Sequence, residues 1–528
     1  MNHIKSIHIE GFKKFRTLDF FFNEHTNILV GENEAGKSTI LEALRIVFNQ
    51  TYKNADKSIL KELFNQDAVN DFTERKCVDA LPQILIEVQL ELDHAGQFSE
   101  QYWGLNYHNM RNNTEAFGIK FECTIEAELL PMLASEIAQG NLPYDYYSFK
   151  WSTFAGLPYT SLRSPLGLIS IDISETETNT SFNYFNRTLF TRKYTDAQRI
   201  QAKHRFRVSL ENAANAMDLT PIDESRCFGI NEKKVPLETV LTVFENGIPL
   251  ENKGKGMESL IKTRIALDRA SNKLDVILLE EPENHLCHAN MQKMLHEIEA
   301  KQSGAQIILT THNDLIASRL GLNNVLWIDK ESIRSFKDVN PQVATFFMKA
   351  ADNGFLQFLL SHKVILVEGP TEMLLLPLFY RQITGRTLEE DEVSIISCNG
   401  ISYKNYLTIA EFSSKRVAVI TDNDGKQKSI DGATTYNSSH ELQHIFMNTD
   451  VSNWTWEVCM YNQNTAMLES MIELEDGAEY HYHRRDVGNR YIGKMLNNKV
   501  EIAYQMVVSG NVFTPPDYVK EAIEWLNA

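Results

Sequence analysis

The sequence predicts an α/β protein with two or more domains. First, 528 residues exceed the usual size of one domain. Second, several short apolar runs end in polar residues and continue into helix-periodic segments, a pattern typical of parallel strands with ligands at their carboxyl ends. Third, other stretches, such as residues 83–93, alternate strictly between apolar and polar residues, which predicts half-exposed antiparallel strands.

Composition excludes several protein classes. The hydrophobic fraction is 43 %, ordinary for a globular chain, and the net charge of −18 disfavours a generally basic nucleic-acid coat while leaving room for a local basic groove. The six cysteines form no C-x-x-C pair, so neither a disulfide framework nor a zinc site is predicted. We find no apolar signal core and no membrane-length apolar run, and therefore expect a cytoplasmic protein without a membrane partner.

The first strong motif follows three predicted strands near residues 4–9, 18–22 and 28–30. It is G-x-x-x-x-G-K-S, with an apolar helix-periodic run after it. Such a loop directs backbone amides at phosphates, the lysine supplies a charge, and the serine hydroxyl binds Mg²⁺. The sequence therefore predicts nucleoside triphosphate binding, as MgATP, by Gly31, Asn33, Gly36, Lys37, Ser38 and Thr39.

Two basic segments, the turn at 13–16 and residues 186–210, each have more than one interpretation. The turn at 13–16 is either a solvated turn or a contact that brings Phe15 or Arg16 to the nucleotide. The stretches 83–93, 119–127 and 168–173 alternate and predict an antiparallel sheet attached to the nucleotide core. Residues 186–210 are strongly basic, with one acid, and are a polyanion contact, an arm that pairs with another subunit, or a solvated helix face.

The second strong motif is an apolar strand that ends in two acids, Glu280 and Glu281. Successive strand residues point in opposite directions, so Glu280 is predicted to hold Mg²⁺ and Glu281 to act as general base. A further apolar strand, 306–310, leads to His312, which is predicted to contact the terminal phosphate. Upstream, a glycine-rich turn at 253–258 opens a helix, and such a turn is a weak signal for anion binding.

Together these motifs resemble an ABC-type ATPase head of the recombination and chromosome-structure ATPases. The resemblance rests on G-F-x-x-F before the P-loop, the glycine-rich helix start, L-L-E-E-P-E-N-H-L and T-T-H. It implies that two heads sandwich ATP, with Gly254, Lys255 and Gly256 of one head capping the γ-phosphate held by the other, and hence a homo-oligomer, a dimer or tetramer. Lys255 replaces the family's usual serine and Glu280 its usual aspartate, which makes slow hydrolysis plausible.

The second half of the chain carries another ordered set of strand-end motifs. An apolar strand at 363–367 precedes Glu368 and Glu372, another leads to 399–400, and a third precedes Asp422 and Asp424. Alternation is expected to put Asp422 and Asp424 on the same side. Carboxylates gathered in this way predict a site for Mg²⁺ or Mn²⁺ that supports phosphodiester chemistry.

This set resembles a Toprim domain, and an ABC-type head followed by Toprim resembles the OLD (overcoming lysogenisation defect) family of nucleases. The resemblance implies catalytic and metal-binding roles for Glu368, Glu372, Asp422, Asp424 and Glu469, and charge stabilisation by Lys499. The basic stretch 481–494 is a candidate DNA-backbone contact. We expect an ATPase domain at 1–335 with an inserted arm at 186–240, a linker at 336–355 and a Toprim domain at 356–528.

The predicted function is an ATP-controlled, divalent-metal-dependent DNA endonuclease or nickase. ATP either drives the nuclease or holds it off as a sensor. The resemblance implies antiphage defence beside partners such as a reverse transcriptase with its RNA, or a helicase. The alternative is a non-cleaving, DNA-clamping ATPase scaffold, which the missing heptads disfavour. A topoisomerase would need a separate tyrosine-bearing domain, for which the chain leaves no room.

Overall fold

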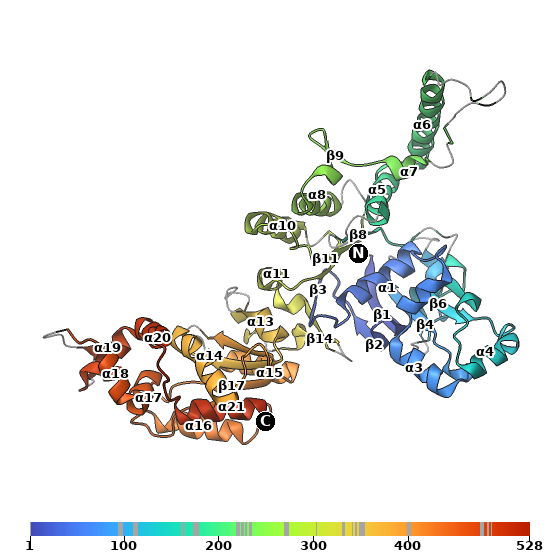
Figure 1. The fold of residues 1–528 in the computed structure, drawn as a ribbon. Helices are drawn as coiled ribbons and strands as arrows, with labels where there is room; N and C mark the ends of the chain where they lie inside the picture. The colour runs from blue at the N-terminus through green and yellow to red at the C-terminus, as the bar shows by residue number, and fades with distance from the viewer. Residues whose placement is uncertain are drawn as a thin grey trace. The chain divides into compact units, whose positions relative to one another are not determined.

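The computed structural model divides the chain into two compact units, Met1–Lys337 and Asp338–Ala528, called here the N-terminal and C-terminal units (Figure 1). Each is described by itself. The structure describes residues 2–528 with these exceptions: 93–98, 109–113, 160–161, 163, 173–178, 218–221, 223–225, 227–229, 232–234, 269–273, 302–303, 330–332, 340–341, 344–345, 348–353, 399–402, 476–479, 483–484 and 487. In this described part, no helix is both long and apolar enough to cross a membrane.

An antiparallel sheet forms one layer of the N-terminal unit. Its strand order is β2-β1-β4-β6-β5, and β7 also pairs with β6. The alternation at 83–93 and 119–127 predicted β4 and β6 and their antiparallel pairing correctly. The predicted half exposure is wrong, because Glu87 and Lys120, on the polar faces of these strands, are only 3 % and 4 % exposed. The strands are β1 (His3–Phe12), β2 (Phe15–Phe21), β4 (Ile84–Glu91), β5 (Trp103–Gly104), β6 (Ala116–Ile125) and β7 (Tyr147–Thr153).

A second, mainly parallel sheet carries the sequence motifs. Its order is β14-β13-β3-β12-β11-β8, and only the β13–β14 pair is antiparallel. Because β3, β12 and β11 are neighbours, the P-loop and the acid motif meet at one edge. The strands are β3 (Thr26–Gly31), β8 (Leu168–Asp172), β11 (Val276–Glu280), β12 (Gln306–Thr310), β13 (Val325–Ile328) and β14 (Ile333–Ser335).

The prediction for 168–173 is wrong. Strand β8 pairs in parallel with β11 and belongs to the nucleotide core, not to the antiparallel sheet. Its alternation is misleading, because Leu168, Ile169 and Ile171 are all buried. A parallel strand covered on both faces keeps apolar residues in both directions.

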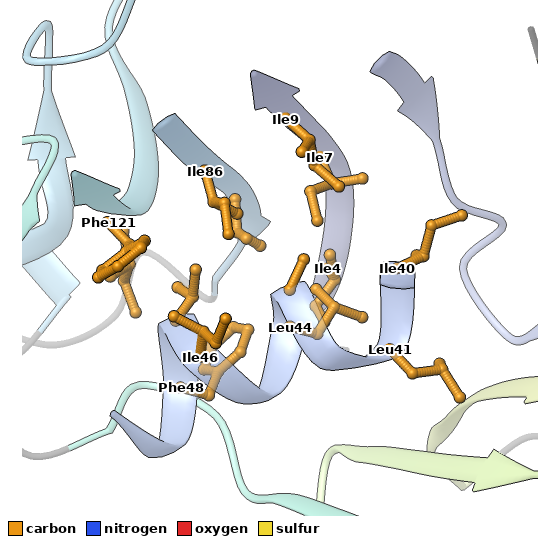
Figure 2. Packing of buried hydrophobic residues seen from close by; sticks show 14 of the residues in the cluster. Ile4, Ile7, Ile9, Ile40, Leu41, Leu44, Ile46, Phe48, Ile86 and Phe121 are labelled. Carbon is orange, nitrogen blue, oxygen red and sulfur yellow. The ribbon is translucent and has the colours of Figure 1, made fainter. Parts of the chain in front are cut away.

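Helix α1 (Lys37–Asn49) follows the P-loop and is packed between the two sheets. Figure 2 shows its apolar side chains, including Leu44 and Ile46, facing residues of β1, β4 and β6 such as Ile86. On the other side, α1 contacts β3 and β11. The Trp151 indole also donates to the Ile46 carbonyl at 2.9 Å. The helix that starts at Lys37 is therefore held rigidly by both sheets.

The remaining elements of the N-terminal unit are mainly helices. The basic segment forms two helices, α5 and α6, separated by a capping box at Thr195. The elements are α2 (Leu60–Leu63), α3 (Gln66–Arg75), α4 (Ala134–Gln139), α5 (Asn179–Lys193), α6 (Asp196–Ala216), α7 (Leu237–Val240), the hairpin β9 (Phe244–Glu245) and β10 (Ile248–Pro249), α8 (Lys255–Leu267), α10 (His288–Lys301) and α11 (Asp314–Arg319).

A four-stranded parallel sheet, ordered β16-β15-β17-β18, is the centre of the C-terminal unit. Strands β15 and β17 lie in the middle, so the residues after them meet at one edge. The strands are β15 (Lys363–Val367), β16 (Val393–Ser397), β17 (Arg416–Ile420), β18 (Gln443–Phe446) and the hairpin β19 (His481–Tyr482) and β20 (Arg485–Asp486). The helices are α13 (Phe355–Leu360), α14 (Pro370–Thr384), α15 (Tyr403–Ser413), α16 (Gln427–Asn437), α17 (Trp456–Gln463), α18 (Thr465–Met471), α19 (Arg490–Asn497), α20 (Lys499–Val508) and α21 (Asp517–Asn527).

Candidate functional site

The P-loop surrounds a cavity of about 470 Å³ at the end of β3. Gly36 has φ 102°, and an added Cβ would lie 2.3 Å from the Phe15 ring, so only glycine fits there. The Lys37 ammonium donates to the Gly31 and Glu32 carbonyls at 2.8 and 2.9 Å. Burial lowers the pKa of Lys37, although the negative charges of Glu281 and Glu32 act in the opposite direction. The lining residues are Lys13, Lys14, Asn33, Glu34, Gly36, Lys37, Ser38, Thr39, Glu281 and His312.

The turn before β2 contributes lysines to this cavity, not the residues named in the sequence analysis. Lys13 and Lys14 line it, whereas Phe15 packs on Gly36 and Arg16 pairs with Asp71. The two lysines add positive charge beside Lys37, as a triphosphate requires.

Glu281 and His312 reach the cavity from neighbouring strand ends. The Glu281 carboxylate accepts from Asn284 at 2.7 Å and lies 3.5 Å from His312 Nε2. Burial and the charge of Lys37 lower the pKa of His312, so its imidazole is neutral near pH 7. Glu283, which our sequence reasoning missed, accepts from the Thr311 hydroxyl at 2.7 Å and the His312 amide at 2.9 Å. Glu283 therefore fixes the loop that presents His312.

Glu280 lies in an ion pair. Its carboxylate lies 2.5 Å from the Arg45 guanidinium, which also donates to the Ser170 hydroxyl at 2.9 Å. Glu280 is only 7 % exposed, so this cation compensates a buried charge. Glu280 is not among the residues that line the P-loop cavity. Arg45 is not part of a motif, and its role was therefore not predicted from the sequence.

The glycine-rich segment begins helix α8 and does not line the P-loop cavity of the same chain. Gly254 and Lys255 are exposed. Gly256 is buried, and an added Cβ would lie 2.2 Å from the His285 carbonyl oxygen. Close packing of α8 on the loop after β11 therefore requires glycine at 256, while 254 and 255 face outward.

Glu368, Glu372, Asp422 and Glu457, called here the carboxylate cluster, lie together in the C-terminal unit. Glu368 accepts from the Thr421 hydroxyl and, at 2.9 Å, from the Asp422 amide. Asp422 in turn accepts from the Trp456 amide at 2.8 Å, and Glu372 from the Gly369 amide at 3.1 Å. Glu457 is 3 % exposed and pairs with Lys499 at 2.9 Å.

Mutual repulsion shifts the pKa values in this cluster. Burial, reinforced by the charges of Glu368, Glu457 and Glu372, raises the pKa of Asp422 well above its usual value. Burial, reinforced by Glu457 and Glu368, raises the pKa of Glu372 to about 7. The charge of Lys499 lowers both pKa values but does not cancel the shifts. Burial and the neighbouring carboxylates therefore disfavour the charged forms of Asp422 and Glu372, and Lys499 does not offset this effect.

The carboxylates open onto a cavity of about 980 Å³ at the ends of β15 and β17. Glu368, Asp422 and Asp424 line it, together with three exposed lysines, Lys404, Lys426 and Lys428. The predicted reason for pairing Asp422 with Asp424 is wrong, because β17 ends at Ile420 and Asp424 lies in a turn with φ 56°. The turn nevertheless brings both carboxylates to one cavity.

The two later predicted residues lie in different surroundings. Lys499, at the start of α20, reaches the carboxylate cluster through Glu457. Glu469 is exposed and accepts from the Tyr461 hydroxyl at 2.5 Å, and it does not line the large cavity. Glu457 was missed because it stands in an apolar helical run with no motif around it. The helix still shows one signal, a single acid among buried residues.

A divalent cation suits the chemistry of these donors. The carboxylates are hard oxygen ligands, and a bound cation would offset the burial and the mutual repulsion that raise the pKa values of Asp422 and Glu372. As the side chains stand, no three His, Cys, Asp or Glu of the described residues converge closely enough to hold an ion.

Some predicted residues lie outside the described part of the chain. These are Asn399 and Gly400 after β16, and His483 and Arg484 in the basic stretch. Elsewhere in that stretch, Arg490 and Lys494 donate to the backbone carbonyls of Glu475 and Glu473 at 2.6 and 2.7 Å. These two cations stabilise a loop of the unit itself.

Two family models match the chain. The AAA ATPase domain model matches residues 3–140 and 168–317, more than half of the chain. The model for the Toprim domain of overcoming lysogenization defect protein-like proteins matches residues 359–424. The second match spans Glu368, Glu372, Asp422 and Asp424.

The curated proteins that are similar in sequence include the following three. The DNA replication and repair protein RecF of Exiguobacterium is 40 % identical over 45 residues, 8 % of this chain and 12 % of that protein. The Old nuclease of Escherichia phage P2 is 28 % identical over 155 residues, 26 % of this chain and 25 % of that protein. The Retron Vc95 probable ATPase of Vibrio cholerae is 23 % identical over 407 residues, 66 % of this chain and 77 % of that protein. The chain thus spans a quarter or less of the first two.

Solved structures show weaker likeness. The SMC head domain from Thermotoga maritima has a TM-score of 0.30 and 14 % identity, over 63 % of this chain and 98 % of that chain. The C-terminal region of the Burkholderia pseudomallei OLD protein has a TM-score of 0.23 and 16 % identity, over 31 % of this chain and 97 % of that chain.

Proposed function

Because this chain belongs to the AAA ATPase domain family and to the OLD family of ATPase–Toprim proteins, we propose that it is an ATP-controlled, divalent-metal-dependent DNA endonuclease or nickase. An ATPase domain implies nucleotide binding, and a Toprim domain implies a divalent cation. The observation that carries the proposal is the cavity of the C-terminal unit, where a floor of carboxylates meets a rim of exposed lysines.

The cavity's charge pattern matches a phosphodiester. Lys404 and Lys428 bind the phosphate backbone, while Lys426 lies 3.2 Å from the Asp424 carboxylate and compensates its charge. Glu368, Asp422 and Asp424 hold a divalent cation, Mg²⁺ or Mn²⁺, which when bound stabilises negative charge on the phosphate oxygens. Glu368 and the Trp456 amide fix Asp422 through hydrogen bonds. Glu372 completes the oxygen donor set from the first turn of α14.

Lys499 and Glu457 have a supporting role in this proposal. Lys499 compensates the buried charge of Glu457 and lowers the pKa values of Asp422 and Glu372. It thereby keeps both carboxylates available as cation ligands. Only the family resemblance supports Glu469 as a cation ligand. Comparing DNA cleavage by Glu457→Gln and by Glu469→Gln tests this role. We expect the larger loss of cleavage from Glu457→Gln.

For the N-terminal unit we propose MgATP binding in the P-loop cavity. Gly31, Gly36, Lys37, Ser38 and Thr39 hold the phosphates, and Glu281 acts as general base beside a neutral His312. Gly254 and Lys255 are exposed at the start of α8, as capping of a second copy's nucleotide requires. This arrangement needs a homo-oligomer with an even number of subunits. Because Arg45 compensates Glu280, hydrolysis is slow.

The biological setting proposed is cytoplasmic antiphage defence. The similarity to a retron ATPase over 66 % of this chain supports a defence role beside a partner such as a reverse transcriptase with its RNA and DNA, or a helicase.

Plasmid cleavage by the full-length protein tests the nuclease. Supercoiled DNA is incubated with Mg²⁺ or Mn²⁺, with and without ATP, and Asp422→Asn is compared with the parent. We expect Asp422→Asn to lower the rate at least about 100-fold, since removing one charged ligand disrupts cation binding. Asp431→Asn, an exposed aspartate on α16, is the matched control and should cleave normally.

The response to ATP separates two modes of control. Faster cleavage with ATP indicates a driven nuclease, whereas inhibition by ATP indicates a sensor that releases the nuclease when ATP falls. Equal cleavage by Asp422→Asn and the parent would refute the site assignment. DNA binding without cleavage under every metal condition would favour the clamping scaffold instead.

A further inference from the structure

We propose that a cavity at the basic arm of the N-terminal unit is a second nucleotide site, separate from the P-loop. The cavity of about 680 Å³ lies between α5, α6, the segment 241–243 and the end of α8. It shares no lining residue with the P-loop cavity. Its expected occupant is one nucleotide, either free or at the end of a nucleic-acid strand. The volume suits a ligand of that size.

Two residues that line the cavity each contain a buried polar oxygen. Asn186 is 4 % exposed, and its amide nitrogen donates to the Leu241 carbonyl at 3.0 Å, while its Oδ1 accepts no hydrogen bond from the described residues. The Thr242 hydroxyl is also buried and has no partner in the described part of the chain. Leaving a buried polar atom unsatisfied costs about 1–3 kcal/mol, so such atoms are rare unless a ligand completes them. The polar edge of a nucleobase offers both donors and acceptors for these atoms.

Apolar and aromatic residues also form walls of the cavity. Leu189 is buried, and Phe190 and Tyr194 have ring centroids 5.3 Å apart. Tyr194 is 44 % exposed, a high value for a large aromatic side chain. Aromatic faces of this kind stack on nucleobases without regard to base identity. The walls therefore favour a flat ring over an extended aliphatic chain.

The rim supplies positive charge for a phosphate. Lys193 and Arg205 both line the cavity, and neither side chain has an ion-pair partner among the described residues. Two other basic residues of the arm are engaged in ion pairs: Arg199 pairs with Asp196, and Lys203 pairs with Glu238. Among the described lining residues Asp268 is the single acid, so the two cations outnumber it. The described lining therefore has a net positive charge.

These three sets of lining residues together point to a nucleotide. A bare anion site would not need the aromatic walls, and a peptide groove would not need two cations at one end. Unpaired hydrogen-bonding atoms, aromatic rings and two cations in one lining provide the kinds of contact that a nucleobase and a phosphate make. The basic arm identified in the sequence then acts through its cavity rather than as a uniformly charged surface.

Calorimetric titration of the full-length protein tests this proposal in a Lys37→Ala background, which weakens binding at the P-loop. The probes are adenosine 5′-monophosphate, inorganic phosphate, and a hexanucleotide of single-stranded DNA with either a 5′-phosphate or a 5′-hydroxyl. We expect saturable binding of the monophosphate or the 5′-phosphorylated strand. Arg205→Glu and Lys193→Glu should each weaken it at least about tenfold, because a charge-assisted contact becomes repulsive.

Arg207→Glu is the matched control, since Arg207 is exposed on the same helix but does not line the cavity. Arg207→Glu should change the dissociation constant of the nucleotide by less than about twofold, because remote surface charges are screened. Thr242→Val, nearly equal in size, should weaken nucleotide binding and leave phosphate binding unchanged. Thermal melts show whether each variant is folded.

Three results would overturn the proposal. One is the absence of saturable binding by every probe. Another is an equal loss of nucleotide affinity in Arg207→Glu and Arg205→Glu, because the arm would then attract anions without a specific site. The third is equal affinity for phosphate and nucleotide, which means an anion site only. Binding confined to adenosine 5′-monophosphate identifies a free nucleotide as the occupant, and binding confined to the 5′-phosphorylated strand identifies a nucleic-acid end.

Discussion

In the N-terminal unit the buried Glu280 has an arginine of its own, whereas in the C-terminal unit the carboxylate cluster has one directly paired lysine among the described residues. Lys37 donates to two backbone carbonyls, and Glu280 is paired with Arg45. At the end of β15 and β17, by contrast, Lys499 is the cation paired directly with a member of the carboxylate cluster. Burial, together with the charges of the neighbouring carboxylates, raises the pKa values of Asp422 and Glu372.

The difference shows how each site responds to its ligand. At the P-loop, a triphosphate has to take Lys37 from the carbonyl oxygens, so binding exchanges one set of contacts for another. In the C-terminal unit, a cation adds compensating charge where the chain supplies too little. We therefore expect variants that remove a counter-charge to affect the two units differently.

The largest effect is expected from breaking the Glu457–Lys499 pair. Lys499→Met leaves a buried carboxylate without its cation, and the free energy of unfolding should fall by about 3 kcal/mol. Glu457→Gln in the same chain should restore part of that loss. Urea unfolding followed by tryptophan fluorescence measures both.

Lys520→Met is the control for this pair, because the Lys520–Glu524 pair is exposed and should contribute less than about 1 kcal/mol. If the double variant is no more stable than Lys499→Met alone, the pair does not have the compensating role assigned to it.

The next largest effect concerns Arg45. Arg45→Met leaves Glu280 buried without a cation and should destabilise the nucleotide-free protein by about 2 kcal/mol. MgATP should recover more stability in this variant than in the parent, because Glu280 is then free to attract Mg²⁺. Thermal melts with and without MgATP test this, with the exposed Arg75→Met as control. Equal stabilisation of variant and parent would contradict the proposed counter-charge role.

A smaller effect is expected from the glycines at the start of α8, of which one is tightly packed and the other is not. Gly256→Ala places a Cβ against the His285 carbonyl and should cost about 1–3 kcal/mol. Gly254→Ala meets no atom within 4 Å and should be nearly neutral for stability. The two variants are compared by chemical denaturation. Similar losses in both would mean that the contact between α8 and the loop after β11 is not tight.

The smallest effect is a pH dependence of the antiparallel sheet. Burial alone lowers the pKa of His8, but hydrogen bonds and charges from Asp19 and Glu10, and the charge of Glu87, outweigh it and raise the pKa above 6.5. The protonated ring then stabilises the fold fully below pH 6.5, and this contribution disappears as the pH rises through the folded-state pKa. His8→Gln should flatten the stability profile in this range. An unchanged profile would exclude His8 as its source.

Local spacing was enough to predict a large part of both sites. The P-loop from Gly31 to Ser38 and the acids after β11, β15 and β17 follow short apolar runs, and strand ends gather such residues at one sheet edge. Among the strands, the existence of β4 and β6 was predicted from another local pattern, the alternation of apolar and polar residues. The alternation at 168–173 failed because it does not say which sheet a strand joins.

What the sequence by itself determined is therefore the set of motifs, their order along the chain and the α/β class. The tertiary structure alone decided which charges meet. Arg45 reaches Glu280 across 235 positions, and Lys499 reaches Glu457 across 42. Neither Arg45 nor Glu457 stands in a motif, because an ion pair depends on the distance between side chains after packing and not on the neighbours of either residue. Asp424 joins Asp422 for the same reason, through a turn rather than through strand alternation.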